Sequence, residues 1–265
     1  MAHEYRVALV TGGASGIGAA TASRLAAEGF TVCVVDIDRV AADDMAGRIG
    51  GLAVACDVSD PEQVDRAFAI CMSELGRVDV VLLNAGVSLH WSGDIGSLDL
   101  GDYRRSVGVN VDGTVFGMRA AVRSMRVRPD GAAGGVIVVT ASTAGLDPWL
   151  PDPVYTLGKH AVIGLVRAVA PSLALEGLAV HAICPGFTQT GMLAERGQLI
   201  EQLGVAVADP SSIADAVVGV LDAPIELSGS AWIAESDKEP WAMQFASVPG
   251  SHNKLNVPVR PRRDT

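Results

Sequence analysis

The stretch that decides the fold is Val7-Ala8-Leu9-Val10-Thr11-Gly12-Gly13-Ala14-Ser15-Gly16-Ile17-Gly18. A short apolar run typical of a buried strand leads through a glycine-rich turn into a helical pattern that stops near Gly29. Glycines let a backbone approach a diphosphate, and the first turn of a helix offers free N–H groups and a partial positive charge. A flexible turn is the alternative, but the flanking strand and helix favour a dinucleotide site, which we expect to include Gly12, Ser15, Gly16, Ile17 and Gly18.

The alternation of apolar strands and helical patterns continues along the chain. We expect further strands at 31–35, 52–56, 78–83, 136–140, 178–184 and 231–234, and helices at 39–49, 61–76, 98–127, 153–176, 192–203 and 209–221. This order predicts an α/β fold with right-handed crossovers and a parallel sheet. Ligands of such sheets lie at the carboxyl ends of the strands.

An acid, Asp36, ends the second expected strand, about 20 residues beyond the glycines. A carboxylate there accepts hydrogen bonds from the adenosine ribose and repels a 2′-phosphate, so it favours NAD over NADP. Ile37 places no cation directly after it, and Arg39 is the nearby cation that opposes the argument. The alternative role for Asp36 is to cap the helix that begins near Arg39.

Polar and small residues follow other strands at the same edge of the expected sheet. Asp57 and Val58 are placed to bond adenine, and Thr188 and Thr190 to bond a carboxamide. The full set of these further cofactor contacts is Ile37, Asp57, Val58, Asn84, Ala85, Gly86, Pro185, Gly186, Thr188 and Thr190.

A second motif joins the strand at 136–140 to the helix that follows it. Tyr155 and Lys159 are four residues apart, so they share one helix face. Free tyrosine titrates near ~10, and a neighbouring ammonium lowers that pKa. Ser142 brings a hydroxyl to a strand end. Together these residues suit proton transfer for an alcohol/ketone pair, although a surface tyrosine and lysine on an amphipathic helix is the alternative.

The long helix expected at 98–127 contains Val109-Asn110-Val111-Asp112-Gly113. Asn and Gly are poor residues inside a helix, so a kink is expected there. Such a kink can turn Asn110 toward the active site, but the local sequence alone favours a solvated polar residue.

Composition excludes several classes of protein. The 265-residue chain has a formal charge of −10, which argues against a nucleic-acid-binding surface. Cys33, Cys56, Cys71 and Cys184 show no paired spacing, so we expect small buried residues, no metal site and a reducing, cytoplasmic location. No apolar run is long enough for a signal peptide or a membrane span.

Over about residues 5–235 the chain resembles the short-chain dehydrogenase/reductase family. The matching motifs are Thr11-Gly12-x-x-x-Gly16-Ile17-Gly18, Asp57-Val58, Asn84-Ala85-Gly86, Asn110, Ser142, Tyr155-x-x-x-Lys159 and Pro185-Gly186. The resemblance implies a single doubly wound Rossmann domain over 1–235. Its seven-stranded parallel sheet would have the order 3-2-1-4-5-6-7, with helices on both faces. A substrate loop at about 187–210 and an extended or partly disordered tail at 236–265 complete the expectation.

The resemblance also implies roles for the catalytic residues. Tyr155 would be the general acid/base, Ser142 would hold the substrate oxygen, and Lys159 would lower the Tyr155 pKa and bond the nicotinamide ribose. Asn110 would hold a water in a proton relay. Family members often form homotetramers or dimers through their two longest helices, here 98–127 and 154–176. The residues after the last strand, Glu235-Ser236-Asp237-Lys238, depart from the usual Asp-Gly-Gly.

The expected substrate pocket is mostly apolar and aromatic, which favours a lipid-like or steroid-like secondary alcohol. Its candidate residues are His90, Trp91, Leu146, Trp149, Leu150, Phe187, Met192 and Leu193. Ordinary core packing is the alternative for each Trp and Leu. Two other functions stay open: a non-catalytic dinucleotide-binding redox sensor, and a reductase acting on a polar carbonyl compound.

Overall fold

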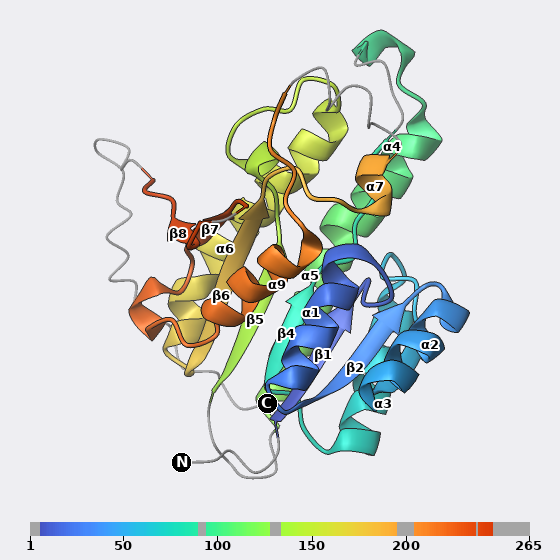
Figure 1. Cartoon of the computed structure of the whole chain (residues 1–265), viewed down its shortest axis with the longest axis vertical. Helices are drawn as coiled ribbons and strands as arrows, with labels where there is room; N and C mark the ends of the chain where they lie inside the picture. Colours follow the sequence, from blue (N-terminus) through green and yellow to red (C-terminus); the bar gives the residue numbers. More distant parts are fainter. Residues whose placement is uncertain (1–5, 90–93, 128–133, 195–203, 237, 246–265) are drawn as a thin grey trace, which may run out of the picture.

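The structure, a computed structural model, describes residues 6–89, 94–127, 134–194, 204–236 and 238–245. Its centre is one eight-stranded sheet with the order β3-β2-β1-β4-β5-β6-β7-β8 (Figure 1). The strands are β1 (Arg6–Thr11), β2 (Phe30–Asp36), β3 (Leu52–Ala55), β4 (Val80–Leu83), β5 (Gly135–Thr140), β6 (Leu178–Pro185), β7 (Ala231–Ala234) and β8 (Trp241–Ala242).

The predicted order of the first seven strands is confirmed, and all their pairings are parallel. The prediction of an all-parallel, seven-stranded sheet is wrong at one edge, where β8 pairs antiparallel with β7. Strand β8 is two residues long, and a strand of that length shows no hydrophobic periodicity.

Helices cover both faces of the sheet (Figure 1). One face packs against α1 (Gly16–Ala27), α2 (Arg39–Ile49) and α9 (Pro210–Gly219). The other packs against α3 (Pro61–Leu75), α5 (Gly113–Met125) and α6 (Pro153–Ala174). Two shorter helices, α4 (Leu100–Val107) and α7 (Gly191–Ala194), lie beyond the carboxyl ends of the strands. Strands buried on both faces read as continuous apolar runs, which is why the sequence shows them so clearly.

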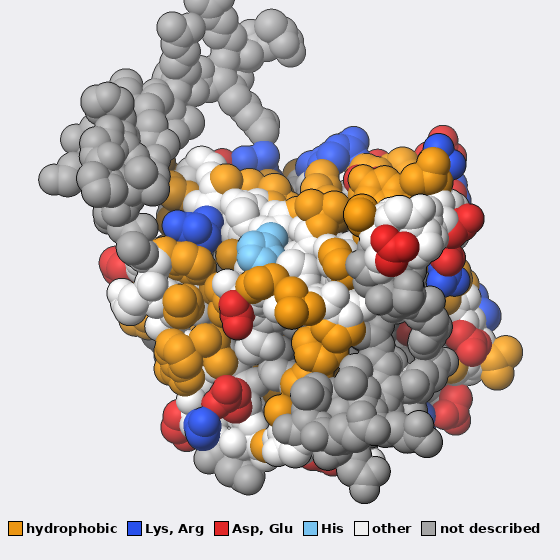
Figure 2. All heavy atoms as spheres, turned by 90° about the horizontal axis from the view of Figure 1, so that it is seen from above, with side chains coloured by type: hydrophobic (Ala, Val, Ile, Leu, Met, Phe, Trp, Pro, Cys, Tyr) orange, Lys and Arg blue, Asp and Glu red, His pale blue; other side chains and the backbone are white. Residues whose placement is uncertain are grey.

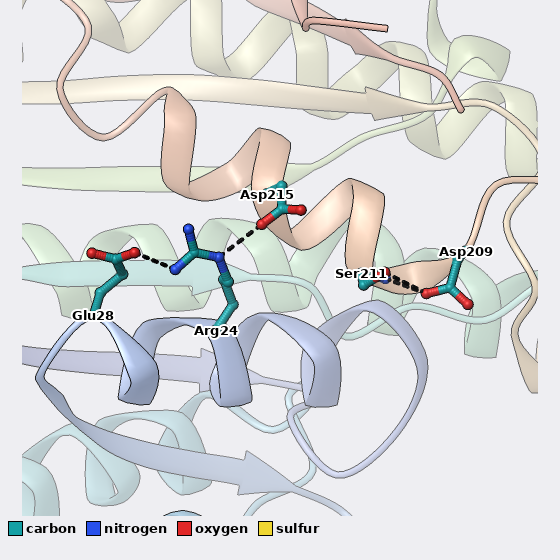
Figure 3. A network of polar contacts seen from close by, with 5 residues as sticks. All are labelled: Arg24, Glu28, Asp209, Ser211 and Asp215. Atoms are coloured by element: carbon teal, nitrogen blue, oxygen red, sulfur yellow. Dashed lines mark hydrogen bonds and ion pairs between the residues drawn. The ribbon is translucent and has the colours of Figure 1, made fainter. Parts of the chain in front are cut away.

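Arg24 joins the first and last of these helices across about 190 residues of chain (Figure 3). From α1 it donates to Asp215 of α9 at 2.7 Å and pairs with Glu28. Asp209 caps α9 by accepting from the Ser211 backbone at 2.8 Å. These groups are exposed, so water and salt screen them. The apolar residues buried between α1 and α9 therefore contribute more to stability than these exposed pairs do.

The helix expected at 98–127 is interrupted where the kink was predicted. Helix α4 passes into a π-helical segment, Gly108–Asp112, before α5 begins. The wider turn points Asn110 inward, where only 2% of it is exposed. The expectation of a solvated Asn110 is therefore wrong, because a π-helical turn reorients its side chains relative to a regular helix.

The described part of the C-terminal segment is ordered against the domain. The Met243 N–H donates to the Ala231 carbonyl at 2.8 Å, and the Arg167 guanidinium lies 3.8 Å from the centre of the Phe245 ring. Residues 246–265 of the predicted tail lie outside the described residues. The helix expected at 192–203 begins at α7, and its remainder from 195 also lies outside them.

All four cysteines are free and buried, as expected from the sequence. Among the helices that the structure describes, none combines the length and the apolar character needed to cross a bilayer.

His181, in β6, is fully buried and accepts from the Trp232 indole at 3.2 Å through Nδ1. Its Nε2 has no hydrogen-bond partner among the described residues. Burial lowers the pKa of His181 from 6.5 to about 4. The unfolded chain therefore takes up a proton as the pH falls through 6.5, and the folded chain does so only near 4.

We expect this difference to remove about 2 kcal/mol of unfolding free energy between about pH 7 and about pH 5. His181→Leu should flatten that part of the pH dependence, although it costs stability at neutral pH by leaving Trp232 without its acceptor. Urea unfolding of both proteins across this pH range measures the two slopes. If the unfolding free energy of both proteins changes equally with pH, His181 is not the group responsible for this pH dependence.

Candidate active site

A cleft of about 800 Å³ opens at the carboxyl ends of the strands. Figure 2 looks down on this end of the molecule, where hydrophobic side chains gather among scattered charges. The cleft is lined by most of the predicted cofactor and catalytic residues, namely Gly12, Ser15, Gly16, Ile17, Asp36, Ile37, Asp57, Val58, Asn84, Ala85, Gly86, Ser142, Tyr155, Lys159, Pro185, Gly186, Thr188 and Thr190. The structure therefore brings the separate motifs of the sequence into one site.

The glycine turn between β1 and α1 is built from close backbone contacts. Gly12 and Gly16 have φ angles of 62° and 52°, a backbone conformation that residues with a side chain rarely adopt. Gly18 does not line the cleft, but a Cβ at this position would stand 2.0 Å from the Gly12 carbonyl oxygen. Gly18 thus holds the helix start against the turn, and the turn keeps its N–H groups at the cleft for a diphosphate.

Asn84 connects three strand ends. Its Nδ2 donates to the carbonyls of Thr11 and Gly12 at 3.2 Å, and its Oδ1 accepts from Thr140 at 3.1 Å. The Asn84 backbone N–H donates to the Thr11 hydroxyl at 2.9 Å. The sequence predicted Asn84 as a cofactor contact. In the structure its side chain also fixes the glycine turn to β4 and β5.

Asp36 faces the glycine turn. One carboxylate oxygen accepts from the Ala14 N–H at 3.0 Å and the other from the Asp38 N–H at 3.1 Å. Asp38, not Asp36, caps α2 by accepting from Ala41, so the capping role considered for Asp36 is wrong. Arg39, the cation that opposed the argument for NAD, is exposed and paired with Asp43 at 2.7 Å.

The remaining strand ends close the two ends of the cleft. Asp57 accepts from the backbone and hydroxyl of Ser59 at 2.9 and 2.7 Å, and Val58 is buried beside it. Thr188 is buried and donates to the Gly186 carbonyl at 3.2 Å, while the Thr190 methyl lies against Gly16. Thr190 therefore contacts the glycine turn from the loop after β6.

Tyr155 and Lys159 lie on the same side of α6, as their spacing predicted. The Lys159 amine is 5.3 Å from the centre of the Tyr155 ring and donates to the Thr140 carbonyl at 2.7 Å. Burial lowers the pKa of Lys159 from 10.5 to about 8, and the nearby Cys184 opposes this only in part. The amine is thus mostly charged at neutral pH and loses its charge as the pH rises through about 8.

Ser142 stands at the end of β5, facing the same cleft. Its Oγ accepts from the Ala144 N–H at 3.1 Å. This bond uses an oxygen lone pair and anchors the side chain, so the hydroxyl proton can be donated to a substrate oxygen.

Asn110 lies beneath the cleft rather than on its wall. Its amide exchanges hydrogen bonds with the Val87 backbone, accepting at 3.0 Å and donating at 2.8 Å. The backbone carbonyl of Asn110 accepts from the Thr114 hydroxyl at 2.9 Å, and Gly158 of α6 faces the Asn110 Cβ. The side chain thereby ties the loop after β4 to the π-helical segment, next to α6.

Part of the cleft wall is aromatic and apolar. Trp149 and Phe187 form an edge-to-face pair with ring centres 5.2 Å apart, and Met192 and Leu193 line the same cleft. Two predicted pocket residues are elsewhere: Leu146 packs against the core, and Leu150 is 78% exposed and does not line the cleft. Both sit in a proline-rich loop, whose direction the sequence does not reveal. His90 and Trp91 lie outside the described residues.

Several residues of the site were not predicted. Ser88, Arg104, Arg105 and Thr140 line the cleft, and Asp152 is buried beneath Tyr155. Thr140 had a usable signal, since it ends β5 at the same sheet edge as the other candidates. Arg104 and Arg105 had no such signal in the sequence, because charged residues on a helix usually face solvent.

One cleft thus contains a glycine turn together with Tyr155 and Lys159. The same motifs occur in known proteins. A family model described as short chain dehydrogenase matches residues 6–200. The chain belongs to this family.

Other short-chain dehydrogenases resemble it over much of their length. The Arabidopsis thaliana protein named Short-chain dehydrogenase reductase ATA1 is 40% identical over 71% of this chain and 68% of its own. The human 15-hydroxyprostaglandin dehydrogenase [NAD(+)] is 31% identical over 93% of both chains. A crystal structure of 3-ketoacyl-(acyl-carrier-protein) reductase from Brucella melitensis, complexed with NADH, covers 88% of this chain and 98% of its own. Its TM-score is 0.80 and its sequence identity 29%. The family, the oxidoreductase class and the NAD cofactor predicted from the sequence agree with these relatives.

Proposed function

We propose that this short-chain dehydrogenase interconverts a secondary alcohol and a ketone, with NAD as cofactor and Tyr155 as the general acid/base. The observation that carries the proposal is the placement of the Lys159 amine 5.3 Å from the Tyr155 ring, in one cleft with the glycine turn. A degraded catalytic set is what a non-catalytic redox sensor would show, and Asn110, Ser142, Tyr155 and Lys159 are all present.

In the direction of oxidation the alcohol loses a proton and a hydride. Bound NAD supplies the acceptor for the hydride. Tyr155 accepts the hydroxyl proton, while the hydroxyl of Ser142 donates a hydrogen bond to the substrate oxygen. The positive charge of Lys159 stabilises the phenolate form of Tyr155. The C–H and O–H bonds break and a C=O bond forms. Positioned proton transfer of this kind is typically worth ~10²–10⁴-fold in rate.

The site fits NAD on its own geometry. A side chain at Gly18 would collide with the turn that we assign to the diphosphate, and Asp36 stands where an adenosine ribose would be bound. A carboxylate at that position repels a 2′-phosphate. The NAD(+) in the name of the human relative and the NADH in the Brucella structure support the same choice.

The substrate is proposed to be hydrophobic. Trp149, Phe187, Met192 and Leu193 supply an apolar wall at the catalytic end, which favours a lipid-like or steroid-like alcohol over a sugar. The prostaglandin dehydrogenase relative is consistent with this substrate class. A reductase acting on a polar carbonyl compound is the second candidate, and the reductase in the name of the Brucella structure supports only the reductase part of it.

We further propose a cytoplasmic homodimer or homotetramer built through the long helices. Each of these helices exposes an apolar side chain, Val115 of α5 by 40% and Leu157 of α6 by 52%.

A substrate panel tests the proposed function. Hydroxylated fatty acids, steroids, short diols and sugar alcohols are offered with NAD and with NADP in parallel, and the formation of reduced cofactor is followed by absorbance. We expect activity with NAD on the hydrophobic alcohols. Activity with NADP alone would overturn the role of Asp36, and activity confined to polyols would overturn the hydrophobic substrate class.

A further inference from the structure

Three of the helices that the structure describes begin with the same dipeptide, Asp-Pro. Asp60, Asp152 and Asp209 are the N-caps of α3, α6 and α9, and each side chain accepts from a backbone N–H of its own first turn. A capping aspartate followed by proline is an ordinary way to start a helix. The three therefore form a matched set in which any additional role can be separated from capping.

Asp152 differs from the other two in burial. It is 0% exposed, whereas Asp209 is exposed and Asp60 partly so. A buried carboxylate is costly unless hydrogen bonds compensate its lost hydration. A helix cap alone does not require burial, as the other two aspartates show. Its burial indicates that Asp152 bonds to more than its own helix.

The additional bonds of Asp152 reach the loop after β4. Its Oδ2 accepts from the Ser88 hydroxyl at 2.8 Å and from the Leu89 N–H at 2.9 Å. Its Oδ1 accepts from the N–H of Tyr155 itself at 2.9 Å. By comparison, Asp60 accepts from the N–H groups of Glu62 and Gln63 in its own helix. Asp209 accepts from Ser211 in its own helix (Figure 3).

We propose that Asp152 is a positioning residue, which fixes Tyr155 against the loop after β4. This inference rests on the proposed function of Tyr155. One carboxylate joins the backbone of the proton-transferring residue to Ser88, which lines the cleft, and to the buried Leu89. The Tyr155 hydroxyl then keeps its place relative to the bound cofactor without Asp152 touching either reactant.

Asparagine at this position tests the link with little change in shape. Both oxygens of Asp152 accept from backbone N–H groups, those of Leu89 and Tyr155. An amide has one oxygen and one NH₂ group, so in either orientation one N–H donor would face another. In a buried site such a mismatch displaces the chain, and a shift of about 1 Å near the reacting atoms can cost ~10²-fold in rate.

The experiment compares Asp152→Asn with the matched controls Asp60→Asn and Asp209→Asn. For Asp152→Asn we expect kcat to fall at least about tenfold, with the KM for alcohol and the Kd for NADH within about threefold of wild type. The controls should stay within about twofold in kcat. A loss in Asp152→Asn no greater than in the controls would overturn the inference, as would a loss in which NADH affinity falls as much as kcat.

A second readout does not depend on turnover. Hydrogen exchange should speed up together at the amides of residues 88–89 and 154–156 in Asp152→Asn, and at neither segment in the controls. Independent exchange of the two segments contradicts the link. If Asp152→Asn does not fold, Ser88→Ala removes the hydroxyl that donates to Asp152 and should lower kcat about threefold to tenfold, with Ser88→Thr restoring it. Unchanged kcat in Ser88→Ala would overturn the inference. A wild-type enzyme inactive on every alcohol would contradict the proposed function. The hydrogen-exchange experiment would still test whether Asp152 joins Tyr155 to the loop after β4.

Discussion

Gly18→Ala is expected to lower the affinity for NADH more than about 100-fold. The new Cβ would stand 2.0 Å from the Gly12 carbonyl oxygen and 2.7 Å from the Asn84 amide nitrogen. The first neighbour is backbone, so the whole turn between β1 and α1 has to move. Because that turn directs its N–H groups at the proposed diphosphate site, its displacement removes the cofactor contacts. Fluorescence titration with NADH measures the loss.

Gly47→Ala is the matched control for this substitution. Gly47 also lies inside a helix, α2, but a Cβ there would have no heavy atom within 4 Å. Alanine is the better helix former by ~1 kcal/mol, so we expect slight stabilisation and unchanged NADH affinity. Normal NADH binding by Gly18→Ala would show that the dinucleotide lies elsewhere.

Tyr155→Phe is expected to lower kcat by ~10²–10⁴-fold, because it removes only the hydroxyl that exchanges the proton. The phenylalanine ring keeps the same packing, so the Kd for NADH should change less than about threefold. Steady-state kinetics with the best alcohol of the panel, together with NADH titration, measures both quantities. Tyr103→Phe, in the half-buried α4 position, is the control and should keep wild-type kcat.

The different expected effects of Gly18→Ala and Tyr155→Phe on NADH affinity and on kcat separate cofactor binding from the chemical step. Gly18→Ala should remove both, whereas Tyr155→Phe should remove only the chemistry. A Tyr155→Phe enzyme that turns over at the wild-type rate would exclude the phenol as the proton acceptor, even if NADH binding maps to the glycine turn.

Much of this site could be predicted from the sequence, because a parallel sheet converts chain order into spatial order. Asp36, Asn84 and Ser142 lie far apart in the chain, yet each follows a strand, and strand ends meet at one edge. The pairing of Tyr155 with Lys159 was equally predictable, since helical geometry places residues four apart on one face.

The missed features depend on tertiary contacts that local patterns do not encode. Asp152 looks like any other Asp-Pro helix start, and its link to Ser88 and Leu89 crosses more than 60 residues of chain. The burial of Asn110 follows from a π-helical turn, for which the sequence offered only poor helix formers. Strand β8 pairs through its backbone with β7, and Phe245 beyond it contacts Arg167. Neither contact leaves a hydrophobic periodicity in the sequence.

The central claim is that Tyr155 takes the proton of an alcohol in the same cleft that binds NAD. Its most direct test is the rate of a single turnover, measured by rapid mixing of enzyme saturated with NAD against excess alcohol. We predict fast formation of enzyme-bound NADH in the wild type. In Tyr155→Phe, with NAD still saturating, NADH should form at least about 100-fold more slowly. Equal rates in the two enzymes would contradict the claim.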